Sequence, residues 1–184
     1  ARAGYRLGHG QLVDSVVKDG LWDVYNDFHM GNCAELCAKD LNIGRSQQDE
    51  FARMSYERAL AAIKGGKFAK EIVAVEVAAK KGPAVKVTED EEPGRSDLTK
   101  MGSLKPAFQP DGGTVTAANA SKINDGASAL VVMSADEAQK RGLTPLARIK
   151  GFAQAAQAPE WFTTAPVAAI QTLLKKPGLR KDQI

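Results

Sequence analysis

The most distinctive pattern of polar and apolar positions lies between Gly112 and Met133. Its first half, which ends near Ser121, is rich in small and polar residues that leave the backbone open to close approach by a ligand, and Asn119 and Asn124 suit tight turns. Its second half ends in the apolar run Leu130–Met133, which predicts a strand buried on both faces of an α/β sheet. A small-residue loop before a central strand suits a ligand platform, and an ordinary connection between two elements is the alternative.

Helical periodicity predicts two helices upstream of this loop. The first covers about residues 33–41, with Asn32 as its N-cap. The second begins at Ser46, where residues 46–49 approximate a capping box, and it ends at a pair of glycines. We expect the apolar stripe of the second helix to consist of Phe51, Met54, Leu60 and Ile63. Glycines break any periodicity in residues 1–20, so an irregular, extended covering segment is expected there.

Two short runs rich in valine predict a hairpin of residues 72–77 and 85–87, with a turn at residues 80–83. Farther along the chain, a capping box at residues 134–137 opens a short helix that Gly142 closes. Residues 147–156 then predict a strand, and Pro166 lies near the start of a helix that runs to about Lys176, before Gly178. This alternation of strands and helices is typical of the α/β class.

Composition narrows the class of protein without giving a function. The 184 residues are 43% hydrophobic and 26% charged, which is ordinary for a globular domain. The net charge of +3 provides no basic stripe for nucleic acid or for a membrane surface. No apolar run approaches the ~20 residues of a membrane span. We therefore expect no nucleic-acid partner and no membrane partner.

The two cysteines, Cys33 and Cys37, lie four residues apart and share one face of the first predicted helix. Without further cysteine or histidine partners they predict two small buried apolar side chains, with a redox pair as the alternative. So few cysteines fit an intracellular compartment, of which we favour the cytoplasm, with the mitochondrion and the peroxisome as alternatives. The chain lacks an initiating methionine and stops at Ile184, where a strand is due, so we expect an internal piece of a longer protein.

The central loop resembles a known family. The run Gly-Thr-Val-Thr-Ala-Ala-Asn-Ala-Ser at residues 113–121, followed by Ile-Asn-Asp-Gly-Ala, closely resembles the thiolases, in particular the short-chain acetyl-CoA acetyltransferases. Residues 19–25, 29–31 and 146–149 resemble other parts of the same family, so the resemblance covers the whole chain. It implies an α/β thiolase fold built from a loop domain and parts of two βαβαβ core domains. The implied boundaries are 1–123 for the CoA-binding loop domain, 124–145 for the end of the N-terminal core domain, and 146–184 for the start of the C-terminal core domain.

The resemblance also implies a CoA site. His29 and Met30 would line the channel for the pantetheine arm, Ser121 would hydrogen-bond its amide, and Phe108 would pack against CoA. From the residues alone, His29 could equally be a satisfied core histidine and Phe108 a buried core aromatic. The segment implied to lie around the adenine and the 3′-phosphate contains Arg95, Ser96, Asp97 and Lys100. Its two cationic side chains suit a phosphate and lie in no obvious helix-pairing pattern, and the alternative is a charged connection without a ligand.

Tyr56 has two interpretations. Its position in the second predicted helix fits an amphipathic side chain at the helix edge. The resemblance implies that Tyr56 contacts CoA and helps to bind a potassium ion, together with the backbone carbonyls of Ala117, Ala118 and Ala120. Carbonyl oxygens suit such a hard, weakly hydrated cation.

The activity that the resemblance implies is the condensation of two acetyl-CoA to acetoacetyl-CoA, or the reverse thiolysis, through a cysteine thioester. Neither Cys33 nor Cys37 lies in the family's nucleophile motif, so we expect the catalytic residues outside this chain and an inactive isolated chain. The alternatives are a 3-ketoacyl-CoA thiolase of broader chain length, against which His29 and Met30 argue, and a non-catalytic lipid or sterol carrier. The resemblance further implies a role in lipid metabolism and a homotetramer, a dimer of dimers, that the loop domain helps to assemble.

Overall fold

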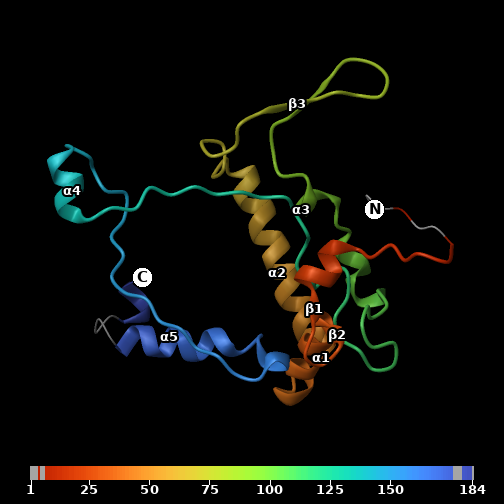
Figure 1. Ribbon diagram of the computed structural model, residues 1–184. Coiled ribbons are helices and arrows are strands. Elements are labelled where there is room, and N and C mark those ends of the chain that lie inside the picture. Colours follow the sequence, from red (N-terminus) through yellow and green to blue (C-terminus); the bar gives the residue numbers. More distant parts are fainter. Residues whose placement is uncertain (1–3, 5–6, 176–179, 184) are drawn as a thin grey trace. The chain divides into compact units, whose positions relative to one another are not determined.

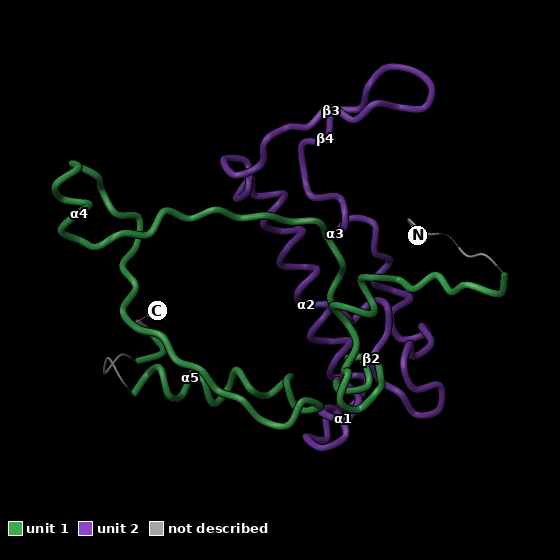
Figure 2. The backbone as a smooth tube through the Cα atoms, viewed as in Figure 1, with its two compact units in different colours: residues 1–33, 121–184 green, residues 34–120 purple. Residues whose placement is uncertain are grey.

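The computed structural model describes residue 4, residues 7–175 and residues 180–183. The chain forms two compact units, one of residues 34–120 and the other of residues 1–33 together with 121–184 (Figure 2). In the described residues, no helix combines the length and the apolar character that a membrane-spanning helix needs.

The unit of residues 34–120 contains most of helix α1 (Met30–Asp40), which begins in the other unit, and the whole of α2 (Arg45–Lys64) (Figure 1). The end of α1 has the geometry of a Schellman motif, because the Ile43 N–H donates to the Ala38 carbonyl at 2.8 Å and Asn42 adopts a left-handed φ of 52°. The predicted glycine end of α2 is confirmed: Gly65 donates its N–H to the Ala61 carbonyl at 2.9 Å.

Both helices begin earlier than the sequence patterns predict. Asn32 is therefore not the N-cap of α1 but lies inside the helix, and the Nδ1 atom of His29 accepts the Gly31 N–H at 2.9 Å instead. Similarly, α2 begins at Arg45, and the predicted capping box at residues 46–49 is wrong. The Gln47 side chain accepts the Gly44 N–H at 2.8 Å, one residue ahead of the predicted pattern.

The apolar stripe predicted for α2 is only partly correct. Ala52 is its buried residue, and Met54 and Ile63 are half-buried. Phe51 is 71% exposed, and Leu60 is exposed as well. Helix α2 packs against two short elements of its own unit, α3 (Glu92–Arg95) and η2 (Leu98–Ser103), and these leave Phe51 and Leu60 exposed.

The predicted hairpin is confirmed over a shorter range. Strands β3 (Val75–Val77) and β4 (Val85–Val87) pair antiparallel, with Val75 opposite Val87 (Figure 1). Ile72 and Val73 lie outside the strand and are exposed. Three of the four strand valines are at least half exposed, so the hairpin contributes little to the core of its unit.

The other unit begins with a turn of π-helix, η1 (Val16–Gly20), and a small antiparallel pair, β1 (Trp22–Asp23) and β2 (Phe28–His29). The expectation of an irregular segment up to residue 20 is therefore wrong at its end. The side chain of Asp14 accepts the Val16 N–H at 2.8 Å, which stabilises the start of η1 in the way of an Asx turn.

The helices of this unit largely agree with the sequence pattern. In α4 (Ala135–Lys140), the Ser134 hydroxyl accepts the Glu137 N–H at 3.2 Å, and Gly142 follows with a φ of +64°. The remaining elements are η3 (Pro159–Trp161), α5 (Ala165–Lys175) and η4 (Lys181–Gln183). Pro166 is the second residue of α5, as predicted, whereas Lys176 and Gly178 lie outside the described residues.

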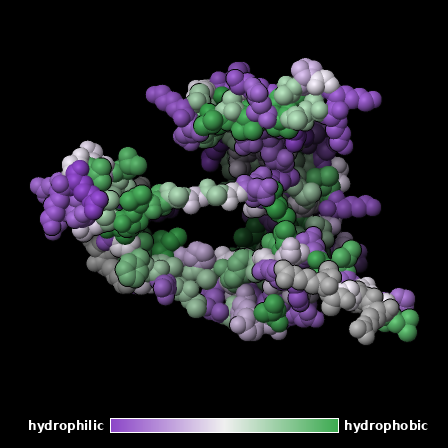
Figure 3. All heavy atoms as spheres, turned by 45° about the horizontal axis from the view of Figure 1, so that its top comes forward, coloured by the Kyte–Doolittle hydropathy of each residue, from purple (hydrophilic) through white to green (hydrophobic). Residues whose placement is uncertain are grey.

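The strands predicted at Leu130–Met133 and at residues 147–156 are wrong. Both segments are extended but form no ladder, and Leu130 and Val131 are 86% and 88% exposed. A strand needs a neighbour for its backbone hydrogen bonds, and within the described ranges neither segment has one. Hydrophobic residues are consequently visible at the surface among the hydrophilic ones (Figure 3).

Candidate functional site

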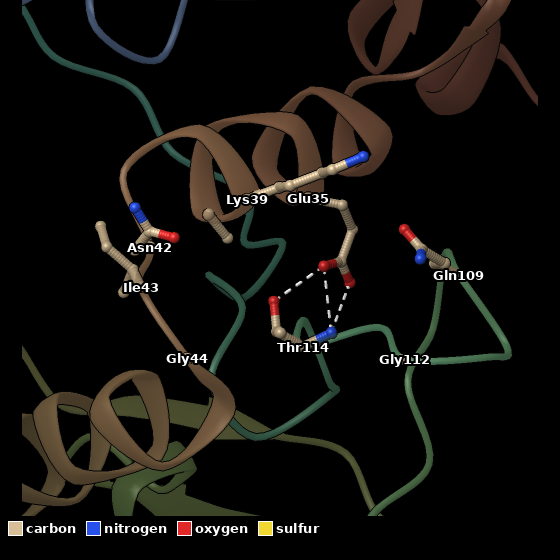
Figure 4. A pocket seen from close by; sticks show the side chains of 9 residues that line it. Glu35, Lys39, Asn42, Ile43, Gly44, Gln109, Gly112 and Thr114 are labelled. Carbon is tan, nitrogen blue, oxygen red and sulfur yellow. Dashed lines mark hydrogen bonds between the residues drawn. The ribbon is translucent and has the colours of Figure 1, made fainter.

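The loop of residues 114–120 is anchored by a carboxylate from α1. Glu35 is only 8% exposed, and its Oε1 atom accepts the N–H groups of Thr114 and Val115, each at 2.8 Å. Its Oε2 atom accepts the Thr114 hydroxyl at 2.7 Å (Figure 4). A buried carboxylate is stable only when its acceptors are satisfied, and here the loop backbone supplies the donors. Sequence reasoning missed Glu35, because nothing in the sequence distinguishes it from a surface acid.

A shallow pocket of about 390 Å³ opens beside this anchor. Its lining consists of Glu35, Ala38, Lys39, Asn42, Ile43, Gly44, Gln109, Gly112 and Thr114 (Figure 4). Because the Glu35 carboxylate points to Thr114 and is engaged there, the pocket holds no buried polar group that requires a ligand.

The loop next makes one helical turn around a fully buried threonine. The N–H groups of Ala118 and Asn119 point to the Thr116 hydroxyl, at 3.3 and 3.4 Å, and the Ala120 N–H donates to the Thr116 carbonyl at 3.0 Å. Across a trans peptide bond, the carbonyl points opposite to the following N–H. The carbonyls of Ala117 and Ala118 are therefore directed away from the Thr116 hydroxyl. The small polar residues of this stretch thus form a tight turn, as Asn119 predicted.

Asn119 ties this turn to α2. Its Oδ1 accepts the Thr116 N–H at 2.7 Å, and its Nδ2 donates to the Thr114 carbonyl and to Asp49 Oδ1, each at 2.9 Å. The other Asp49 oxygen pairs with Arg45 Nε at 2.7 Å. Asp49 therefore acts as an anchor of the loop, not as the capping-box residue that the sequence predicts.

Gly113 is required just before the anchored residues by close packing of the backbone. A Cβ atom at this position would lie 2.1 Å from the Gln109 carbonyl oxygen and 2.8 Å from the Cβ of Pro106. No side chain fits there. The preceding Gly112 needs glycine for a different reason, its φ of +71°.

The segment predicted to lie around the adenine is exposed and internally paired. Arg95 pairs with Glu91 at 2.9 Å, and Lys100 pairs with Asp97 at 3.1 Å, so the expectation that neither cation has a helix-type partner is wrong. Asp97 also accepts the Thr99 hydroxyl at 2.6 Å, and this bond, together with Lys100, lowers the pKa of its carboxyl. The side chains of Arg95 and Lys100 are 64% and 73% exposed, and such pairs are weak. Both cations can exchange their partners for an anion.

Three further predicted site residues, Tyr56, Phe108 and Ser96, are half-buried. Tyr56 follows Asp49 by seven residues on the same face of α2, about 10 Å along the helix axis. Ser96 directly follows α3.

In the other unit, the β1–β2 turn positions His29 and Met30. Asp23 is 5% exposed and accepts the N–H groups of Tyr25 and Asn26, at 2.9 and 3.2 Å. The Met30 N–H donates to the Leu21 carbonyl at 2.8 Å. Because His29 Nδ1 accepts the Gly31 N–H, the Nε2 atom is the one that carries the ring proton in the neutral form. Ser121 also belongs to this unit, and it is exposed.

Cys33 does not have the surroundings of a nucleophile. It is fully buried, and burial raises the pKa of its thiol, with Asp23 and then Glu160 adding to the effect. Asn26 bridges these two acids, at 2.7 Å from Asp23 and 3.4 Å from Glu160. A reactive cysteine needs the opposite, a lowered pKa. The prediction of a buried packing residue is confirmed for Cys33, whereas Cys37 is half-buried and both thiols are free.

The fold and the anchored loop place the chain in a known class. Residues 1–136 match the family model described as "Thiolase, N-terminal domain". The chain therefore belongs to the thiolase family, and the predicted α/β thiolase fold is confirmed.

The relatives identify the branch of the family that the chain is similar to. It is 52% identical to acetyl-CoA acetyltransferase 2 of Arabidopsis thaliana and 54% identical to the mitochondrial acetyl-CoA acetyltransferase of Homo sapiens. All of the chain is covered in both alignments, against 46% and 43% of those proteins, so the chain spans less than half the length of these relatives.

Solved structures give the same result. A thiolase from Ascaris suum in complex with coenzyme A superimposes with a TM-score of 0.87 at 43% identity, covering 100% of this chain and 47% of that one. The acetyl-CoA acetyltransferase of Bacillus anthracis superimposes with a TM-score of 0.84 at 38% identity, covering 98% of this chain and 45% of that one.

Proposed function

We propose that this chain supplies a CoA-binding part of an acetyl-CoA C-acetyltransferase. The complete protein would condense two acetyl-CoA to acetoacetyl-CoA and CoA, or catalyse the reverse thiolysis. The observation that carries the proposal is the fixed turn at residues 116–120, which leads directly into Ser121. Glu35 anchors the two residues that precede the turn, and Asp49 anchors Asn119 within it. Because these hydrogen bonds already fix its conformation, the turn can bind a ligand through its backbone without reorganisation.

The pantetheine arm is assigned to residues from several segments of the chain. Ser121 has a hydroxyl able to donate to or accept from an amide, and its exposure leaves it accessible. His29 would donate a hydrogen bond to the pantetheine arm from Nε2, because Nδ1 already accepts the Gly31 N–H. Met30, Tyr56 and Phe108 would supply apolar contact surface. In these assignments the residues of this chain bind and orient the substrate, and they perform no covalent step.

The adenine and the 3′-phosphate are assigned to Arg95, Ser96, Asp97 and Lys100. Their cations are close to the surface and engaged only in weak pairs, so exchange for a phosphate costs little. This exchange would leave Glu91 and Asp97 without their cationic partners, and both carboxylates are accessible to water.

The covalent chemistry is assigned to a cysteine outside this chain. In thiolysis, that thiolate attacks the ketone carbonyl of acetoacetyl-CoA, the bond between the α and β carbons breaks, and the leaving carbanion takes a proton to become acetyl-CoA. The thiolate of a second CoA then takes the acetyl group from the cysteine. Cys33 cannot serve here, because it is fully buried and its pKa is raised.

A potassium ion is assigned to carbonyls of this turn. The carbonyls of Ala117 and Ala118 are directed away from the Thr116 hydroxyl, and neutral oxygens of this kind suit a large monovalent cation. Ala120 and the hydroxyl of Tyr56 are assigned as further ligands. When bound, the ion would hold these carbonyls electrostatically, while Glu35 anchors the residues before the turn and Asp49 anchors Asn119 within it.

The domain boundaries at residues 123/124 and 145/146, the homotetramer built as a dimer of dimers, and the role in lipid metabolism belong to the same proposal. We place the protein inside the cell, where acetyl-CoA is made and used, and favour the cytoplasm over the mitochondrion and the peroxisome.

The test is an acetoacetyl-CoA thiolysis assay on the complete protein that contains this chain. The wild type should cleave acetoacetyl-CoA, and Ser121→Ala and His29→Ala should each raise KM for CoA substrates about tenfold with a smaller change in kcat. Ser128→Ala removes an exposed serine of the same extended segment and should change neither constant. A wild type that binds CoA or lipid without turnover would be a carrier, and the proposed activity would be wrong.

A further inference from the structure

Two segments assigned to different ends of CoA are attached to a single turn of α2. Asp49 uses its Oδ1 atom to accept Asn119 Nδ2 at 2.9 Å, across a separation of 70 residues. It uses its Oδ2 atom to accept Arg45 Nε at 2.7 Å. Arg45 continues the chain of hydrogen bonds, because its NH2 group donates to the Met101 carbonyl at 2.6 Å, across 56 residues.

Asn119, Asp49, Arg45 and Met101 thus form a hydrogen-bonded relay. Each end of this relay lies next to a segment of the proposed site. Met101 is 4% exposed and directly follows Lys100, within η2. Asn119 lies inside the turn whose carbonyls are assigned to potassium, two residues before Ser121. The relay thus connects the segment assigned to the 3′-phosphate with the turn that leads to the pantetheine residue.

The relay has little freedom to rearrange. The side chains of Arg45 and Asp49 are 23% and 15% exposed, so water can replace few of their contacts. Both of its bonds to Asp49 are charge-assisted, and such bonds are about twice as strong as neutral ones. A displacement at either end must therefore move the other end or break a partly buried bond.

A second ion-pair cluster on the same helix has none of these properties. Arg53 pairs with Glu50 and Glu57, all three on α2, with side chains 42–55% exposed. It connects α2 only to itself. The Arg53 cluster therefore stabilises α2 locally, whereas the relay joins three segments that are far apart in the sequence.

We propose that Asp49 is a positioning residue. Through Asn119 and Arg45 it fixes the position of the turn at residues 116–120 relative to the η2 segment, so that one CoA molecule can bind to both. This inference rests on the proposed function for its ligand. The coupling between the two segments does not depend on the ligand and can be measured alone.

The test uses the complete protein and two ligands, CoA and pantetheine, which lacks the adenine and the phosphates. Arg45→Gln frees only the η2 side and should raise Kd for CoA about tenfold while leaving Kd for pantetheine within about twofold. Asn119→Ala should raise both values, and the double variant Asp49→Asn with Asn119→Ala should bind CoA no more weakly than the worse single variant. The matched control Glu50→Gln removes a neighbouring charge on α2 and should change neither.

The proposal is overturned if Arg45→Gln changes both ligands equally, or if the effects of the Asp49 and Asn119 variants multiply. Hydrogen exchange provides a reading without ligand: Asp49→Asn should accelerate amide exchange in both residues 98–104 and 114–120, and acceleration in only one of them contradicts the coupling. A wild type that binds no CoA while this paired acceleration is observed would refute the proposed function and leave the coupling intact.

Discussion

Glu35 and Thr114 are joined by three hydrogen bonds although 79 residues separate them in the sequence. The carboxylate on α1 receives both the backbone N–H and the hydroxyl of Thr114, and the same hydroxyl accepts Gln48 Nε2 at 2.8 Å. The loop is therefore fixed to both helices at the residue where it begins to turn. Everything assigned to ligand binding in this loop depends on that attachment.

Removal of the Glu35 carboxylate should release the loop. Glu35→Ala leaves the part-buried N–H of Thr114 and the buried N–H of Val115 without an acceptor, at a cost of about 2 kcal/mol. Amide exchange across residues 112–120 should then be roughly 30-fold faster in the complete protein, as measured by mass spectrometry. Glu76→Gln, on the exposed strand β3, is the control and should leave these amides unchanged.

Gly113 should tolerate no side chain. In Gly113→Ala the new Cβ atom clashes with the Gln109 carbonyl oxygen, which belongs to the backbone and cannot move aside by a change of rotamer. We expect a loss of at least about 2 kcal/mol of stability, read as a lower melting temperature, together with weaker CoA binding. Gly126→Ala is the matched control, because a Cβ there meets nothing within 4 Å. Equal melting temperatures for the two variants would contradict the close approach at Gly113.

The β1–β2 turn should respond to acid through Asp23. Its hydrogen bond from Asn26 is the main cause that lowers the pKa of this carboxyl in the folded state. A lowered pKa contributes stability above the unfolded value of about 3.9, and this contribution is lost as the pH falls through the folded value. The difference in melting temperature between the wild type and Asp23→Asn should therefore shrink below about pH 4. A constant difference from pH 3 to pH 7, or the same behaviour in the exposed control Asp19→Asn, would refute this role.

Potassium should act through the turn and Tyr56. Replacement of potassium by tetramethylammonium, which is too large for a carbonyl site, should raise KM for CoA substrates several-fold in the complete protein. Tyr56→Phe should reduce this response, whereas Tyr25→Phe, at a residue that is 81% exposed, should retain it. Identical kinetics of the wild type in both salts would contradict the proposal that a potassium ion binds at this turn.

Local signals in the sequence predicted local structure well. Gly65, Ser134 and Gly142 set helix ends, and the alternating valines set the β3–β4 pair, because each of these effects acts within a few residues. The apolar run at Leu130 predicted a buried strand and was wrong for the described chain. Burial and pairing depend on a neighbouring segment, and sequence periodicity does not report whether one is present.

In the candidate site, too, the sequence predicted the local structure but not the contacts between distant segments. The small residues of the loop indicated a tight turn from sequence alone, and Asn119 forms it. The two acids that hold the turn, Glu35 and Asp49, carried no signal, since a buried acid on a helix has the same local pattern as a solvated one. Their partners lie 79 and 70 residues away, a distance that only the folded chain reveals.

CoA binding by the proposed site is tested by a calorimetric titration of CoA into the complete protein, with the wild type beside Ser121→Ala. We expect the wild type to bind CoA at a single site per chain, and loss of one hydroxyl hydrogen bond to weaken binding about tenfold. A wild type that takes up no CoA, or a Ser121→Ala variant that binds as tightly as the wild type, would contradict this expectation.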